Sequence, residues 1–212
     1  MRGLRVAGKP GAGKGQAYTP ALMEAGDSGD EALMLRYAGG DAGAFDELYA
    51  RHRGGLYRYL LRQLGNNRAV AEELFQEIWM NLIGARSRYR VEAKFTTWLY
   101  TLAHNRVIDH FRRHRALELV SLDADDDDDA AELPAPGTAQ PERAAEARQH
   151  AARLLALVEA LPQAQREAFL LHEEGGLSVD EIAAVTGTDR EAIKSRLRYA
   201  LDKLRRGMGD AL

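Results

Sequence analysis

Apolar residues recur at steps of three and four along much of the chain, and this spacing constrains the fold more than any other feature. One such run comprises Phe45, Leu48, Tyr49, His52, Leu56, Tyr59 and Leu60. A second comprises Val70, Leu74, Ile78 and Leu82. Steps of three and four place side chains on one face of an α-helix. Because no stretch of useful length alternates as a β-strand would, the sequence predicts an all-α protein.

Glycine, asparagine and polar residues between the runs predict where the helices begin and end. Helices are expected from Asp30 to about Arg115, with Gly65-Asn66-Asn67 as a stop followed by a cap. A polar connector from Arg86 to Val91 precedes the stretch KFTTWLYTLAHNRVIDHFRR. That stretch predicts a further helix, capped by Thr96 or Thr97.

The last third of the chain carries the clearest local motif. Ser178-Val-Asp-Glu181 and Thr188-Asp-Arg-Glu191 both fit a capping box, in which a Ser or Thr and a Glu three residues later cap a helix reciprocally. Thr186-Gly187 stands between them as a turn. Two capped helices around a glycine-containing turn predict a helix-turn-helix.

Composition divides the chain into a leader at 1–26, a helical domain at 27–116, a linker at 117–147 and a second helical domain at 148–212. The leader is rich in glycine, without periodicity, and is expected to be disordered. Residues 117–147 hold 1 Lys or Arg against 10 Asp and Glu, with five consecutive aspartates. Such a segment buries too little apolar surface to offset its ordering entropy, so a flexible acidic linker is predicted.

Composition also excludes several classes of function. The chain has no cysteine, which excludes disulfides and thiolate catalysis. No apolar run approaches the roughly 18 residues that span a bilayer, so membrane insertion is not expected and the predicted location is the cytoplasm. Gly8, Gly13 and Lys14 fit a phosphate loop, but Gly15 stands where a hydroxyl should bind magnesium. An enzyme that hydrolyses a nucleotide there remains the catalytic alternative.

Histidines in the KFTTWLYTLAHNRVIDHFRR stretch and just after it raise the question of a metal site. His110 and His114 are four residues apart, but Phe111 replaces the glutamate of an HExxH motif. The neighbouring arginines would repel a cation. No serine lies in a nucleophile-elbow sequence. We therefore predict no catalytic residue, no metal and no cofactor.

Two basic segments favour a polyanionic partner. Residues 86–115 hold eight Lys and Arg against two acids, interleaved with aromatic residues, a pattern that suits unpaired nucleic acid. Residues 190–206 hold seven against two. There Lys194, Ser195 and Arg198 project away from the apolar stripe, early enough in the helix to reach base edges in a major groove. The alternatives are an aromatic core with solvated arginines, and a solvated basic face on a structural hairpin.

A third surface favours a protein partner. Glu72, Glu73, Gln76 and Glu77 surround Phe75 and Trp79, which we expect to be exposed on an acidic helix face. Exposed aromatic residues beside charged ones are typical of protein–protein interfaces. The alternative is an ordinary solvated face.

Taken in order, these pieces resemble an extracytoplasmic-function sigma factor of the sigma-70 family. The resemblance rests on GDAGAFDELYARHRGGLYRYLLRQLG, AEELFQEIWMNLI, KFTTWLYTLAHNRVIDHFRR and LSVDEIAAVTGTDREAIKSRLRYALDKLR, with the acidic linker between the last two. It covers about residues 30–206. Ile83 departs from it, because the family often has an aromatic residue there, and the leader lies outside the pattern.

The resemblance implies a fold and a function. The first domain would be the sigma region 2 helical bundle and the second the region 4 helix-turn-helix. The protein would bind core RNA polymerase through its beta-prime and beta subunits and direct it to promoter DNA, under the control of an anti-sigma factor. The rival from another class is a stand-alone helix-turn-helix regulator that binds DNA without polymerase.

The resemblance also assigns residues. Those implied to recognise and melt the promoter −10 element are Arg86, Arg88, Tyr89, Lys94, Phe95, Trp98, Asn105, Arg106, Arg112 and Arg113. Those implied to read the −35 element as duplex are Arg190, Lys194, Ser195, Arg196, Arg198, Tyr199 and Lys203. Those implied to bind the core polymerase, on its beta-prime coiled coil, are Glu72, Glu73, Gln76, Glu77 and Trp79.

Overall fold

The computed structural model describes residues 29–118 and 141–209. The predicted leader and most of the predicted linker, including the five consecutive aspartates, lie outside the described residues. Within the described ranges every regular element is a helix, so the prediction of an all-α fold is confirmed.

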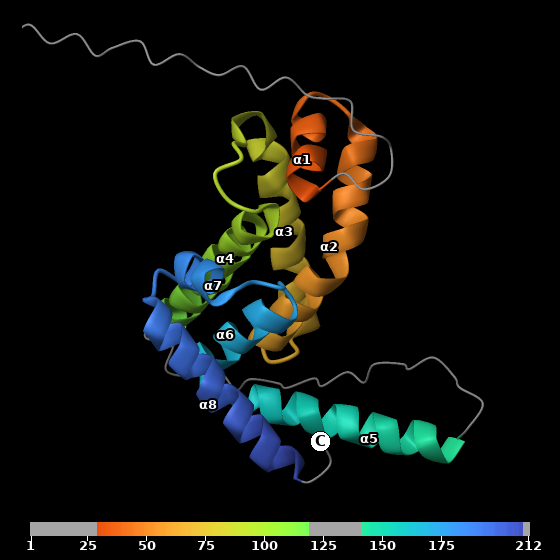
Figure 1. Cartoon of the computed structure of the whole chain (residues 1–212), viewed down its shortest axis with the longest axis vertical. Coiled ribbons are helices and arrows are strands. Elements are labelled where there is room, and N and C mark those ends of the chain that lie inside the picture. Colours follow the sequence, from red (N-terminus) through yellow and green to blue (C-terminus); the bar gives the residue numbers. More distant parts are fainter. Residues whose placement is uncertain (1–28, 119–140, 210–212) are drawn as a thin grey trace, which may run out of the picture.

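Eight α-helices and one 3-10 turn make up the described chain (Figure 1). The elements of the N-terminal half are α1 (Asp30–Ala38), α2 (Ala42–Gln63), α3 (Arg68–Ala85), the 3-10 turn η1 (Arg86–Arg88) and α4 (Phe95–Glu118). Those of the C-terminal half are α5 (Pro141–Glu159), α6 (Gln163–Glu173), α7 (Val179–Thr186) and α8 (Arg190–Met208). Helix α5 thus begins inside the segment predicted as linker.

The apolar stripes of the sequence form the core. Side chains of α2, α3 and α4 that are fully buried include Leu56, Ile78 and Leu99. In the C-terminal half, Leu170, Ile182 and Ile193 are buried to the same extent. The two halves are not separated by solvent, because α7 packs on α4 and α6 packs on α2. Figure 1 shows α7 lying across α4.

Several predicted helix ends are confirmed. Asn67 caps α3 by accepting a hydrogen bond from the Val70 amide at 3.2 Å, and Gly65 and Asn66 take the left-handed conformation before it. At α7, Ser178 and Glu181 form the reciprocal capping box. Gly187 ends α7 with φ of 61°, a conformation that glycine adopts without steric cost.

Two predicted caps were wrong. Helix α8 is capped by Asp189, whose side chain accepts from the Ala192 amide at 2.9 Å, and not by Thr188. Helix α4 begins at Phe95, so Thr96 and Thr97 lie inside its first turn. Its first amide instead donates to Glu31 Oε1 of α1 at 2.7 Å. A carboxylate from a distant helix therefore replaces the local cap.

Candidate nucleic-acid interface

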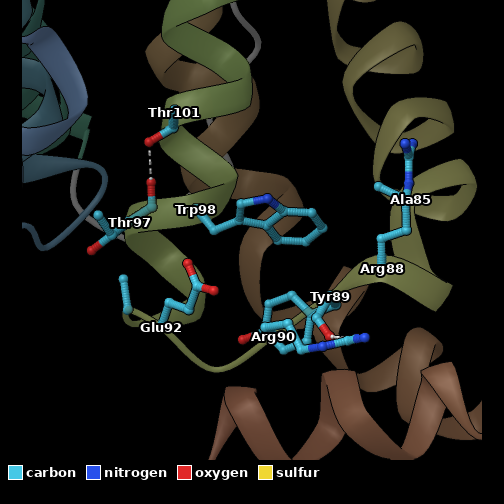
Figure 2. A pocket seen from close by; sticks show the side chains of 9 residues that line it. Ala85, Arg88, Tyr89, Arg90, Glu92, Thr97, Trp98 and Thr101 are labelled. Atoms are coloured by element: carbon cyan, nitrogen blue, oxygen red, sulfur yellow. Dashed lines mark hydrogen bonds between the residues drawn. The ribbon is translucent and has the colours of Figure 1, made fainter. Parts of the chain in front are cut away.

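A pocket of about 350 Å³ opens between the end of α3, the connector that follows it and the first turns of α4. Figure 2 shows Trp98 projecting from α4 towards Tyr89 and Arg90 on the connector. The two aromatic rings have centroids 5.1 Å apart. The pocket is lined by Ala85, Arg88, Tyr89, Arg90, Glu92, Ala93, Thr97, Trp98 and Thr101. Its volume suits a single planar ring system, and Trp98 is half-buried rather than fully covered.

Two lining residues carry hydroxyl groups without hydrogen-bond partners in the described part of the chain. Tyr89 OH and Thr97 Oγ1 are both buried and unpaired. Burial, with smaller contributions from the carboxylates of Glu31 and Asp30, raises the pKa of Tyr89 to about 12, so its hydroxyl is neutral. An unsatisfied buried polar group costs about 1–3 kcal/mol. Both oxygens are closed off from solvent, so a ligand would reach them, and recover part of that free energy, only when the connector moves.

Exposed basic side chains flank the pocket, whose lining also holds the exposed carboxylate of Glu92. Arg86, Arg88 and Arg90 are exposed along the connector, and the Arg86 guanidinium lies 5.6 Å from the centroid of the Tyr37 ring. Lys94 is also exposed, and its Nζ lies 3.0 Å from Glu181 Oε1 of α7. A basic rim beside a half-covered indole provides phosphate contacts and a stacking platform together.

Phe95 does not belong to the accessible part of this site. Its side chain is fully buried, with its ring centroid 5.1 Å from that of His52. Phe95, which the resemblance implies for the −10 element, therefore has no exposed ring on which a base could stack. It is the first residue of α4, and burying its ring fixes the start of that helix against α2. Tyr89 is also buried, so its ring supports Trp98 more than it faces solvent.

The rest of α4 carries the other residues that the resemblance had assigned to the −10 element. Asn105, Arg112 and Arg113 are exposed, and Arg112 forms an ion pair with Asp109 at 2.7 Å. Arg106 is half-buried, and its Nε lies 3.9 Å from Glu77 of α3. Arg106 thus faces the acidic helix rather than the pocket.

Helix α3 presents an acidic face, but its tryptophan does not belong to it. Glu72, Glu73 and Gln76 are exposed, and Glu77 is half-buried. Trp79 is only 5% exposed, so its expected exposure was wrong. Its ring packs against Phe45, Tyr49 and Phe75, with centroids 4.9 to 6.2 Å away.

Met80 is the apolar residue that this face does expose, with 66% of its surface accessible. Sequence reasoning missed it. The signal was present, because Met80 follows Gln76 by four residues and Glu73 by seven, which is the spacing of one helix face.

The helix-turn-helix presents a basic face on α8. Ile193, Ala200 and Leu204 are buried, which leaves Arg190, Lys194, Arg198, Tyr199 and Lys203 exposed. The Arg198 guanidinium lies 5.1 Å from the centroid of the Tyr199 ring. Intramolecular ion pairs join Arg190 to Asp180 and Lys194 to Glu191. Ser195 is half-buried, as is Arg196, whose Nη1 lies 3.4 Å from Thr188 Oγ1 and which therefore faces the turn.

The histidines are engaged with protein groups. His104 Nδ1 lies 2.6 Å from Glu167 Oε1, and the ring centroids of His110 and His114 are 5.5 Å apart. Among the residues described, no group of three or more His, Asp or Glu is placed to hold a metal ion. Nor is any helix in the described ranges long and apolar enough to cross a membrane.

Two family models match the chain. Sigma-70 region 2 matches residues 48–117, which hold the pocket and the acidic face. Sigma-70 region 4 matches residues 151–204, which hold the helix-turn-helix.

Relatives match over most of the chain. It is 32% identical over 178 residues to the RNA polymerase sigma factor CarQ of Myxococcus xanthus, covering 84% of this chain and 96% of CarQ. It is 31% identical over 181 residues to the ECF RNA polymerase sigma factor SigK of Mycobacterium bovis, covering 82% and 91%. Among solved structures, CnrH in complex with the cytosolic domain of CnrY matches with a TM-score of 0.57 and 25% identity, covering 82% and 94%. The chain therefore belongs to the extracytoplasmic-function sigma factors of the sigma-70 family, which direct RNA polymerase to promoters.

Proposed function

We propose that this sigma factor holds an unstacked base of the −10 element in the pocket beside Trp98. The observation that carries the proposal is the pair of buried hydroxyls of Tyr89 and Thr97, which have no partner among the described residues and belong to the lining of a ring-sized pocket beside exposed arginines. A base displaced from the duplex has a face to stack on the indole and polar edges for the hydroxyls. The arginines of the connector then bind the flanking phosphates.

Further along α4, exposed basic residues extend this surface. Asn105, Arg112 and Arg113 provide an amide and two cations to the strand or to the adjoining duplex. Arg106 has a different role in this proposal. Because Arg106 faces Glu77, it links α4 to the acidic face of α3.

The −35 element is read as duplex by the exposed face of α8. Lys194 and Arg198 lie in the first half of the helix, from which side chains of a recognition helix reach base edges in the major groove. Arg190 and Lys203 lie near the two ends of the face and contact phosphates. The Tyr199 ring holds the Arg198 guanidinium in place by a cation–π contact.

Core polymerase is bound by the acidic face of α3, on the beta-prime subunit. Glu72, Glu73, Gln76 and Glu77 form the charged rim, and Met80 is the apolar anchor among them. An exposed apolar side chain inside a charged rim is a common arrangement for a binding hot spot. Trp79 is buried beneath this face and packs against the ring of Tyr49.

The protein acts by binding and not by catalysis, in the cytoplasm with the polymerase, and an anti-sigma factor controls it. The solved CnrH complex contains the cytosolic domain of a second protein, CnrY, which supports control by a separate protein.

Transcription with purified components tests the proposal. The protein is mixed with bacterial core RNA polymerase lacking sigma and with sheared genomic DNA from its host. We expect discrete start sites that share two spaced elements, and we expect Trp98→Ala to lose transcription from duplex templates. Trp98→Tyr, which keeps a stacking ring, is the matched control and should retain most activity. Equal activity of all three proteins would refute the pocket assignment.

A further inference from the structure

Helix α1 contacts both ends of the connector, the segment 86–94 that joins α3 to α4. At the first end, the Arg86 guanidinium lies 5.6 Å from the centroid of the Tyr37 ring, and its Nη1 lies 3.5 Å from the Tyr37 hydroxyl. At the other end, the Phe95 amide donates a hydrogen bond to Glu31 Oε1 at 2.7 Å. Tyr37 and Glu31 lie on one helix, and the six positions between them span about 9 Å. We call these two contacts the α1 clamp.

The clamp is itself held in place by α2. At the start of α1, the Asp30 carboxylate is bound by Arg51 Nη1 at 2.9 Å and lies 2.7 Å from His52 Nε2. At the other end of α1, the Tyr37 ring packs on Phe45, with ring centroids 4.9 Å apart. Helix α1 has nine residues, which is too few for a helix to be stable on its own in water. Contacts with α2 at both ends therefore fix its position.

The middle of the connector is held differently from its ends. Residues 90–93 are all exposed, and Val91 has 54% of its surface accessible. An open hollow of about 400 Å³ is lined by Glu31 of α1 together with residues 91–94. The hollow leaves room for the middle of the connector to move, which access to the buried hydroxyls beside Trp98 requires. The two ends can stay in place during that movement because α1 holds them.

The clamp controls the two groups that the proposed −10 site uses first. Arg86 supplies a phosphate contact, and Trp98 supplies the stacking ring. Trp98 lies three positions after Phe95, so the hydrogen bond to Glu31 fixes the turn of α4 from which the indole projects. The cation–π contact with Tyr37 limits the orientations of the Arg86 guanidinium. An arginine that is already restrained loses less conformational freedom when it binds a phosphate.

We propose that Tyr37 and Glu31 are positioning residues for the −10 site, which hold Arg86 and Trp98 at a fixed spacing while the connector between them moves. The inference rests on the proposed assignment of a −10 base to the pocket beside Trp98. It gives α1 a part in promoter opening, although α1 precedes residues 48–117, which match sigma-70 region 2. Tyr37 and Glu31 act through their partners and not by contact with DNA.

Binding of a single-stranded oligonucleotide that carries the −10 element of a mapped promoter tests the clamp. The reconstituted holoenzyme is titrated and fluorescence anisotropy is measured. Tyr37→Leu keeps an apolar side chain but removes the ring, so affinity should fall about two- to tenfold, the cost of restraining one free arginine. Tyr37→Phe keeps the ring and should restore the affinity. Leu35→Ala, at a position of α1 that is 46% exposed, is the matched control and should bind as the parent does.

A double-mutant cycle separates positioning from direct contact and from a general structural defect. If Tyr37 acts through Arg86, the double variant Tyr37→Leu, Arg86→Ala should lose no more affinity than Arg86→Ala alone. Affinity for core polymerase and for −35 duplex should equal that of the parent in every variant. A defect in folding would instead weaken all three kinds of binding together.

The other end of the clamp is tested in the same titration. Glu31→Gln keeps an oxygen that accepts from the Phe95 amide, so it should bind the oligonucleotide nearly as well as the parent. Glu31→Ala removes the acceptor and should bind more weakly. Its Trp98 emission, obtained by difference from the matching Trp98→Phe protein, should also shift, because the turn that carries the indole is no longer fixed.

Three results would contradict parts of this account. Undiminished affinity in folded Tyr37→Leu and Glu31→Ala proteins, together with a loss in Trp98→Ala, would overturn the clamp and leave the pocket assignment intact. Additive losses from Tyr37→Leu and Arg86→Ala would overturn positioning through Arg86. Undiminished affinity in Trp98→Ala would refute the pocket assignment itself, and the role of the clamp in −10 binding with it.

Discussion

The carboxylate of Glu31 accepts a hydrogen bond from the Phe95 amide at 2.7 Å, across 64 positions of the chain. Helix α1 thereby caps helix α4 and sets the position from which Trp98 projects. The Glu31→Ala substitution should lower the free energy of unfolding by about 1 kcal/mol, the usual cost of a lost N-cap. Chemical denaturation measures this. Asp46→Ala, at an exposed position in α2, should leave the free energy nearly unchanged. Equal stability of the two variants would show that Glu31 is not a cap.

Removing the Tyr89 hydroxyl should change stability and DNA binding in opposite directions. Tyr89→Phe removes a buried polar atom that has no partner within residues 29–118 and 141–209, so the free energy of unfolding should stay constant or rise. Affinity of the holoenzyme for single-stranded −10 DNA should fall, by about 0.5–1.5 kcal/mol if a base uses that hydroxyl. Denaturation and fluorescence anisotropy measure the two quantities. Lower stability with unchanged affinity would contradict the assignment.

Met80 and Trp79 are adjacent in sequence and should respond differently to truncation. Met80→Ala should weaken binding to core polymerase by more than about 1 kcal/mol with little effect on stability, because the residue is 66% exposed. Trp79→Ala should cost about 3–5 kcal/mol of stability, because its ring is buried among aromatic residues. Core affinity is measured by biolayer interferometry and stability by denaturation. Unchanged core affinity of folded Met80→Ala would remove Met80 from the interface.

Arg198 is expected to carry base recognition in the −35 duplex. Arg198→Ala should weaken binding to the preferred −35 sequence by about 1–3 kcal/mol and reduce discrimination between bases at one position. Lys203→Ala, a change at a proposed phosphate contact, should weaken all sequences about equally. Competition binding with a set of single-base duplex variants distinguishes the two patterns. A uniform loss in both variants would assign Arg198 to the backbone.

Glu181 makes stability dependent on acid pH. Hydrogen bonds from the side chain and backbone of Ser178, with the nearby Lys94, lower the pKa of Glu181 from 4.5 to about 2. Because the pKa is lower in the folded state, the stabilisation is complete above pH about 4.5 and is lost as pH falls towards about 2. Denaturation between pH 2 and 6 should show this slope, and Glu181→Gln should reduce it. An identical slope in the variant would place the titrating group elsewhere.

Helices and their local ends were predictable because their signals lie within a few residues. Asn67 and Ser178 bond to amides three positions ahead, so spacing alone identifies them as caps. Thr188 fits the same pattern but does not cap α8, because the helix begins at Arg190 and the adjacent Asp189 occupies the cap position. Choosing between two neighbouring capping residues depends on backbone geometry that sequence spacing does not encode.

Burial was less predictable than helix formation, because it depends on neighbouring helices. Trp79 and Met80 both border the acidic stripe in sequence, and packing of α3 against Phe45 and Tyr49 of α2 decides which one is covered. The Phe95 amide donates to the Glu31 carboxylate, and the Tyr100 hydroxyl donates to the Glu174 backbone carbonyl. Both hydrogen bonds join residues far apart in the chain. No periodicity or motif in the sequence points to either contact.

The two tryptophans of the chain give it an intrinsic optical readout. Trp79 is enclosed in the core, and Trp98 is half-buried beside the pocket. Their emission should therefore separate into a blue-shifted component that follows unfolding and a red-shifted component that is quenched when a base stacks. A Trp98→Phe protein isolates the first component, and its difference from the parent protein gives the second. Folding and promoter opening can therefore both be followed without any attached dye.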